Sequence, residues 1–182
     1  CNNNESDTFA DPQQDVVGAV WTTGENGYVY NISAVAYYFA AQIMEDLDMP
    51  VGILNASLGG SAIASWISRE AIDSDGEVKN YLVSQGKYIE KSDWETVNPS
   101  IYYDMTTNYN HKIHPLRNFR PSGMIWYQGE SDSSVPEGKV YAEELCELIK
   151  IWRRDLRDEN LPFVVIQIAD YDERDDEGWH LV

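Results

Sequence analysis

Residues 124–132 read Met124-Ile125-Trp126-Tyr127-Gln128-Gly129-Glu130-Ser131-Asp132, and this stretch decides the fold class. Its first four residues are apolar or aromatic, too few for a helix, and they follow a turn-forming Pro-Ser-Gly, so they predict a buried strand. Polar side chains begin directly afterwards at Gln128. In open parallel α/β sheets, ligands bind beyond the carboxyl ends of the strands. The stretch therefore predicts a core strand with a candidate site at its exit.

Two further apolar runs predict strands of the same sheet. Residues 51–56 and 163–168 are short, apolar and without alternation, as is typical of strands buried on both faces. Helical patterns separate these runs: residues 34–47, and residues 136–156 with apolar residues at spacings of three and four. Strands that alternate with helices predict an α/β fold, in which a parallel sheet is covered by helices on both faces in three α/β/α layers.

The length of 182 residues corresponds to one domain. Residues 1–15 are polar and without a period, and they predict an extended or disordered lead-in to a domain over residues 16–182. Between the first two strands, residues 69–112 are expected to form a helical insertion over the sheet.

Charge and composition narrow the function. Thirty-one acidic against 13 basic residues give a formal charge of −18, which argues against nucleic acid and anionic membrane surfaces as partners. No apolar stretch approaches the roughly 20 residues that a membrane span requires. The two cysteines, Cys1 and Cys146, fit neither a disulfide framework nor a metal site. No cofactor is expected.

Two groups of residues are candidates for chemistry. Gly59 and Gly60 follow the first predicted strand, where the absence of a Cβ lets backbone N–H groups approach a ligand and form an oxyanion hole. Gln128, Glu130 and Asp132 follow the second strand, where an amide can donate to an oxyanion and a carboxylate can orient it. Each group also has a purely structural interpretation, as a strand-to-helix turn and as a capped turn with a solvated Asp132.

The acidic loop over residues 170–177 offers oxygen ligands of the kind that calcium prefers. Its spacing fits no EF-hand loop, and a solvated loop is the favoured interpretation, so no metal is predicted.

Two segments of the chain resemble a known family. Residues 125–132 resemble the WYQGES(N/D) block of the sialate O-acetylesterases and related carbohydrate acetylesterases, a branch of the SGNH-type serine hydrolases. Residues 50–66 resemble the PVGLI-SSWGGT-IEAW block of the same family, with Leu58 in place of the usual Trp and Ala64 in place of the usual Glu. The resemblance runs from about Asp15 to Val182 and implies the central part of an SGNH-hydrolase, flavodoxin-like domain that is incomplete in this chain.

The resemblance also implies roles for residues. The implied catalytic residues are Gly60, Gln128, Gly129 and Glu130, and the implied substrate-binding residues are Gly59, Trp66, Tyr127 and Asp132. Gly60 and Gln128 are expected to hold the oxyanion of an acetyl ester during hydrolysis.

The nucleophile and base are expected outside this chain. The family's serine lies in a Gly-Gln-Ser-Asn block and its acid and base in an Asp-x-x-His-Pro block, and neither block occurs here. His111 and His114 are interpreted as surface or helix-end residues, and no catalytic role is implied for His180. The chain alone is therefore expected to be inactive, with an acetylated carbohydrate and further segments of the polypeptide, or a companion chain, as partners. The family implies an extracellular or periplasmic location. A non-catalytic carbohydrate-binding or scaffold domain on the same fold is the alternative.

Overall fold

The computed structural model describes residues 10–16, 18–23, 27–97, 99–100, 102–171 and 178–182. The chain forms two compact units, one over residues 17–59 and the other over residues 2–16 and 60–182. In the first unit, Ser33 caps helix α1 (Ala34–Leu47) by accepting a hydrogen bond from the Ala36 N–H. A short 3-10 helix (Tyr28–Asn31) precedes it.

The predicted strand over residues 51–56 is wrong. This segment is extended but pairs with no described strand, and several of its residues are exposed. An apolar run becomes a strand only when a neighbour supplies backbone hydrogen bonds, and no described segment does so here. The Gly59-Gly60 turn that follows it is present.

The larger unit contains the parallel sheet. Strand β1 (Met124–Tyr127) pairs in parallel with β2 (Phe163–Ile166), with Met124 opposite Phe163 and Tyr127 opposite Ile166. The crossover between them contains a short helix α5 (Val135–Gly138) and the long helix α6 (Tyr141–Asp155), where the sequence predicts one continuous helix. The parallel α/β class predicted from the sequence is confirmed.

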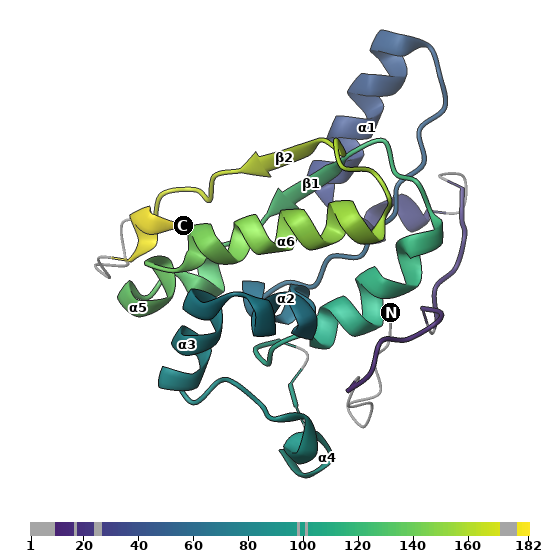
Figure 1. Ribbon diagram of the computed structural model, residues 1–182. Helices are drawn as coiled ribbons and strands as arrows, with labels where there is room; N and C mark the ends of the chain where they lie inside the picture. The colour runs from purple at the N-terminus through teal and green to yellow at the C-terminus, as the bar shows by residue number, and fades with distance from the viewer. Residues whose placement is uncertain (1–9, 17, 24–26, 98, 101, 172–177) are drawn as a thin grey trace. The chain divides into compact units, whose positions relative to one another are not determined.

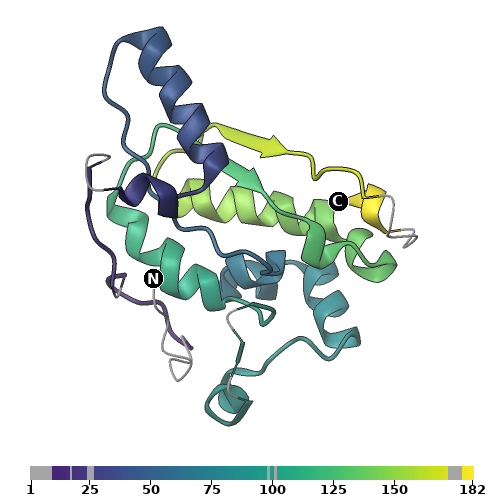
Figure 2. The same cartoon turned by 180° about the vertical axis from the view of Figure 1, so that it is seen from behind.

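Short helices pack beside α6 on the side away from the sheet. Helices α2 (Arg69–Ser74) and α3 (Gly76–Ser84) contact α6, so within this unit the order is sheet, α6, then α2 and α3 (Figures 1 and 2). The remaining helical segments are η3 (Ile63–Trp66), η4 (Lys91–Asp93), α4 (Trp94–Val97), the π-helix η5 (Tyr109–Ile113), η6 (His114–Asn118), η7 (Glu130–Asp132) and η8 (Trp179–Leu181). The helical insertion expected over residues 69–112 is thus a series of short helices.

Tryptophans form the centre of this core. The rings of Trp66, Trp126 and Trp152 meet edge to face, with centroids 5.8–6.4 Å apart. Each indole N–H is satisfied: Trp66 donates to Ser61 Oγ, Trp126 to Tyr141 Oη and Trp152 to the Trp66 carbonyl. Large aromatic rings thereby bury apolar area without leaving a polar atom unpaired. This packing fixes η3 and α6 against β1, which positions the residues at the strand exit.

Candidate active site at the exit of strand β1

The Gln128 side chain joins two segments that are far apart in sequence. Its Nε2 donates to the Ser61 carbonyl at 2.9 Å and to Asp132 Oδ2 at 2.5 Å, while its Oε1 accepts from the Tyr141 hydroxyl at 2.9 Å. A primary amide carries two N–H groups, so both donors are engaged. We call Gln128, Asp132 and their bonds to residues 61–63 the Gln128–Asp132 brace.

Asp132 completes the brace from the other side. Its Oδ2 also accepts from the Ile63 backbone N–H at 2.8 Å, and the residue is only 4% exposed. Burial raises the pKa of the Asp132 carboxyl to about 6, although the hydrogen bonds from Gln128 and Ile63 oppose this rise. The interpretation of Asp132 as a solvated carboxylate is therefore wrong, because the side chain points inward.

The brace holds the segment after the glycine turn against the exit of β1. Gly60 has a φ of +78°, a backbone conformation that residues with a side chain rarely adopt. A Cβ placed at this position would have no atom within 4 Å. Its exposed N–H donates to no acceptor among the described residues. Gly60 therefore presents the kind of donor that an oxyanion requires. Gly59, which ends the other unit, lacks the positive φ.

The other predicted residues at the strand exit differ in exposure. Gly129 is buried, and a Cβ there would approach Ile168 and Val182 to within 3.2–3.3 Å, so a glycine is required for packing. Glu130 is exposed at the start of η7, and Tyr127 is 46% exposed at the end of β1. These two side chains are accessible to a ligand.

Two predicted substrate contacts are not accessible in this arrangement. Trp66 is 4% exposed because its ring packs between Trp126 and Trp152, and Asp132 is equally buried within the brace. Both side chains instead belong to the core that positions the strand exit. His111, interpreted as a surface residue, is also buried, within the π-helix η5, whereas His114 begins η6 and His180 is exposed.

One participant, Tyr141, was not among the residues predicted for the site from the sequence. Its hydroxyl proton is shared between Gln128 Oε1 and the Gln128 carbonyl, and its oxygen accepts from the Trp126 indole. Burial raises the pKa of the Tyr141 hydroxyl, which keeps it protonated as a donor. The hydroxyl of a buried tyrosine needs a hydrogen-bond partner, and this requirement could have indicated from the sequence that Tyr141 contacts a polar residue.

Neither metal ligation nor membrane crossing finds support in the part of the chain that the structure describes. It contains no cluster of three or more histidine, cysteine or acidic side chains able to hold a metal, and no helix long and apolar enough to cross a bilayer. Most of the acidic loop, residues 172–177, lies outside the described residues.

Comparisons with known proteins place the chain in a family. Residues 23–182 match the family described as carbohydrate esterase, sialic acid-specific acetylesterase. The chain belongs to this family. It is 29% identical to the sialate O-acetylesterases of Mus musculus, over 170 residues, and of Homo sapiens, over 164 residues; each alignment covers 81% of this chain, but 31% and 28% of those proteins.

A solved structure extends the similarity to three dimensions. A carbohydrate acetylesterase from Xanthomonas citri superposes with a TM-score of 0.72 at 28% identity, covering 94% of this chain and 35% of that one. The fold is therefore that of the SGNH-type acetylesterases. The chain spans about a third of the length of the relatives that it matches.

Proposed function

We propose that this chain is the oxyanion-holding part of a carbohydrate O-acetylesterase, which hydrolyses acetyl esters on sugars. The observation that supports the proposal best is the brace, because it joins residues from the two segments that resemble the family and fixes the turn that carries the Gly60 N–H. A donor held in place before the reaction stabilises the developing oxyanion without reorganisation.

Gln128 acts in this proposal mainly by positioning. Both of its N–H groups are engaged, so it can donate to an oxyanion only by exchanging Ser61 or Asp132 for the ligand. Gly60 is the principal donor, and Gly129 allows Ile168 and Val182 to pack closely against the exit of β1. The exposed Glu130 and Tyr127 face the acyl or sugar group.

Other segments of the polypeptide supply the nucleophile, base and orienting acid. A serine from one segment attacks the acetyl carbonyl, while an Asp-His pair from another removes its proton and later protonates the leaving alkoxide of the sugar. The same additional polypeptide, or a companion chain, pairs along the two-stranded sheet. We further propose an extracellular or periplasmic location, which fractionation of the source cells with an antibody to this chain tests.

The experiment compares two glycines in the source polypeptide that contains this chain. Gly60→Ala and Gly86→Ala both place a side chain at a positive φ, +78° and +66°, with no atom within 4 Å of the new Cβ. The backbone strain is therefore similar, but only Gly60 lies at the proposed oxyanion turn. Alanine keeps the backbone N–H but disfavours the φ of +78° that orients it, so the variant tests the position of this donor. On an O-acetylated sialic acid at saturating concentration, Gly60→Ala should lower kcat by up to about 10²-fold, the loss typical of one oxyanion donor.

Gly86→Ala should keep near-parental turnover. Equal turnover in both variants would refute the oxyanion assignment. Absence of any esterase activity in the parent, together with retained binding of the sugar, would favour the non-catalytic carbohydrate-binding domain instead.

A further inference from the structure

A cavity lies at the opposite end of helix α6 from the brace. Its volume is about 430 Å³, within the range of about 300 to 1,000 Å³ for small-molecule sites. Tyr141 at the start of α6 contacts Gln128 at the carboxyl end of β1, whereas Arg154, Asp155 and Arg157 at its other end line this cavity. A helix of 15 residues is about 20 Å long, so the cavity is separate from the candidate active site.

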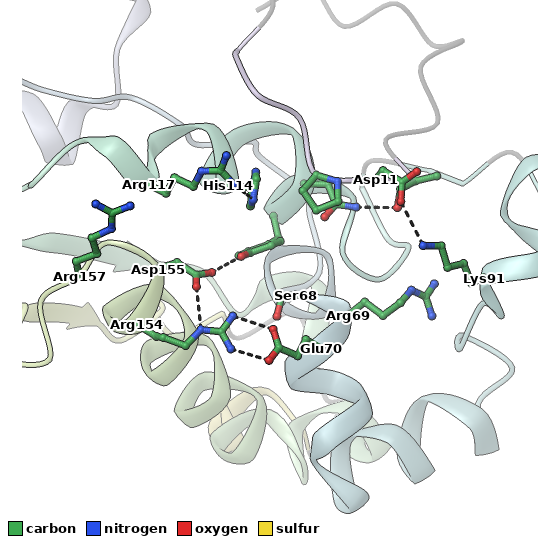
Figure 3. A pocket seen from close by; sticks show the side chains of 14 residues that line it. Asp11, Ser68, Arg69, Glu70, Lys91, His114, Arg117, Arg154, Asp155 and Arg157 are labelled. Atoms are coloured by element: carbon green, nitrogen blue, oxygen red, sulfur yellow. Dashed lines mark hydrogen bonds and ion pairs between the residues drawn. The ribbon is translucent and has the colours of Figure 1, made fainter.

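The cavity collects positive charge in a chain of net charge −18. Five of the 13 basic residues line it, against three carboxylates. The basic residues are Arg69, Lys91, Arg117, Arg154 and Arg157. Figure 3 shows these side chains, with Arg117 and Arg157 on the same side of the cavity as His114. A local surplus of cations against an acidic background indicates an anion-binding site.

The lining carboxylates are already paired. Arg154 binds Glu70 at 2.9 Å and Asp155 at 2.9 Å, and Asp155 also accepts from the Tyr109 hydroxyl. Lys91 lies 3.5 Å from Asp11. The carboxylates of the lining are therefore already paired with cations of the same cavity.

Three arginines of the lining form no ion pair within 4 Å in the described part of the chain, although Arg69 interacts at longer range with the Asp73 carboxylate and lowers its pKa. Arg69 donates to the Ile89 carbonyl at 2.8 Å and stacks over the Trp94 ring. Arg117 donates to the Gln14 side chain and to His114 Nε2, which requires the His114 proton to be on Nδ1, where it is donated to the Gln13 carbonyl. None of these partners neutralises a guanidinium charge.

Arg157 completes the set just beyond α6, where the helix dipole favours a cation. The dipole explains Arg157 but not Arg69 or Arg117, which come from other elements. We propose that this cavity binds a small polyanion of about sugar size through its carboxylate or phosphate oxygens, because the guanidinium group pairs with both in the same bidentate geometry.

Calorimetric titration of the purified 182-residue chain at low ionic strength tests the proposal. The probes are citrate, glucose 6-phosphate and, as the neutral reference, glucose. Citrate or glucose 6-phosphate should bind and glucose should not; whichever anion binds more tightly identifies the preferred oxygen chemistry. Arg117→Gln and Arg157→Asn should each weaken anion binding about tenfold, the effect of losing one hydrogen bond to a charged group. Asn tolerates the positive φ of +59° at position 157.

Arg120→Ala is the matched control, because Arg120 is exposed and outside the cavity lining. It should weaken anion binding less than either cavity variant, because its charge is exposed to solvent and makes no direct contact with a ligand in the cavity. The proposal is overturned if neither anion binds, if glucose binds as well as glucose 6-phosphate, or if Arg120→Ala weakens binding as much as the two cavity variants. Circular dichroism confirms that each variant is folded before titration.

Discussion

At the residue scale, the brace predicts a combined effect on stability and activity. Gln128→Ala removes a donor to the buried Asp132, a donor to the Ser61 carbonyl and the acceptor of the Tyr141 hydroxyl. We expect a loss of about 2 to 4 kcal/mol in the free energy of unfolding, because buried polar groups are left unpaired. In the active polypeptide, turnover should fall as well, because the Gly60 turn loses its support.

Tyr127→Phe is the control, since Tyr127 is at the same strand exit but half-exposed. It should leave thermal stability unchanged and lower turnover less than Gln128→Ala does, because the Tyr127 hydroxyl takes no part in the brace. Urea unfolding and kcat on the same acetylated sugar separate two roles for Gln128: a direct oxyanion donor lowers kcat without loss of stability, whereas the brace lowers both. A Gln128→Ala variant with parental values for both would show that our assignment of the brace is wrong.

Asp132 predicts a pH dependence of stability with a definite sign. Its pKa is about 6 in the folded chain, against 3.8 for an ordinary aspartate, so the folded state holds this proton more tightly. The resulting stabilisation is present below pH 4 and is lost as the pH rises through about 6, by about 3 kcal/mol. The positive charge of Lys87 lowers the pKa of Asp132, and the negative charge of Glu137 raises it.

Asp132→Asn should remove this contribution to the pH dependence of the free energy of unfolding. The lowered pKa of Asp73 acts in the opposite direction in parent and variant alike, so it cancels in the difference between the two stability curves. That difference reports Asp132 together with its coupling to Glu137 and Glu144, whose carboxylates interact with the Asp132 charge. Asp170→Asn removes the same charge from an exposed position and serves as the control. Parallel curves for parent and Asp132→Asn between pH 4 and 7, measured by urea unfolding, would contradict the buried carboxylate.

At the element scale, local pattern predicted the parts whose partners lie nearby in sequence. Helix α1 and the strands β1 and β2 follow from capping, helical spacing and apolar runs. The division of the predicted long helix into α5 and α6 was missed, as was the absence of pairing at residues 51–56. A strand depends on hydrogen bonds from another segment, and no periodicity within the run reveals whether that segment is present.

The candidate site also combines features that the local sequence predicts with features that depend on contacts between distant segments. Motifs identified the strand exit and the glycine turn, but not which side chains point inward. Asp132 and Trp66 were predicted as ligand contacts and are core residues, because bonds to residues 61–63 and packing on Trp152 determine their direction. Such contacts between segments more than 60 residues apart are set by tertiary structure.

At the scale of the whole molecule, the sheet carries exposed apolar surface. Val164 and Val165 on β2 are 43% and 48% exposed although they point to opposite faces of the strand. Isolated two-stranded sheets are marginal, and exposed strand edges invite pairing. These features agree with the proposal that further polypeptide completes the sheet beside β1 or β2.

The last prediction concerns catalysis by the isolated chain. We expect the purified 182-residue chain not to hydrolyse 4-nitrophenyl acetate above the uncatalysed rate, because an oxyanion donor without an activated nucleophile cannot form an acyl-enzyme. The serine hydroxyls do not suggest otherwise: Ser57 donates to Asn55 and Ser65 to the Ala62 carbonyl. Adding the segments that carry the Gly-Gln-Ser-Asn and Asp-x-x-His-Pro blocks should restore turnover. Robust turnover by the chain alone, abolished by a serine-directed phosphonate that labels Ser57, Ser61 or Ser131, would overturn this division of the catalytic machinery.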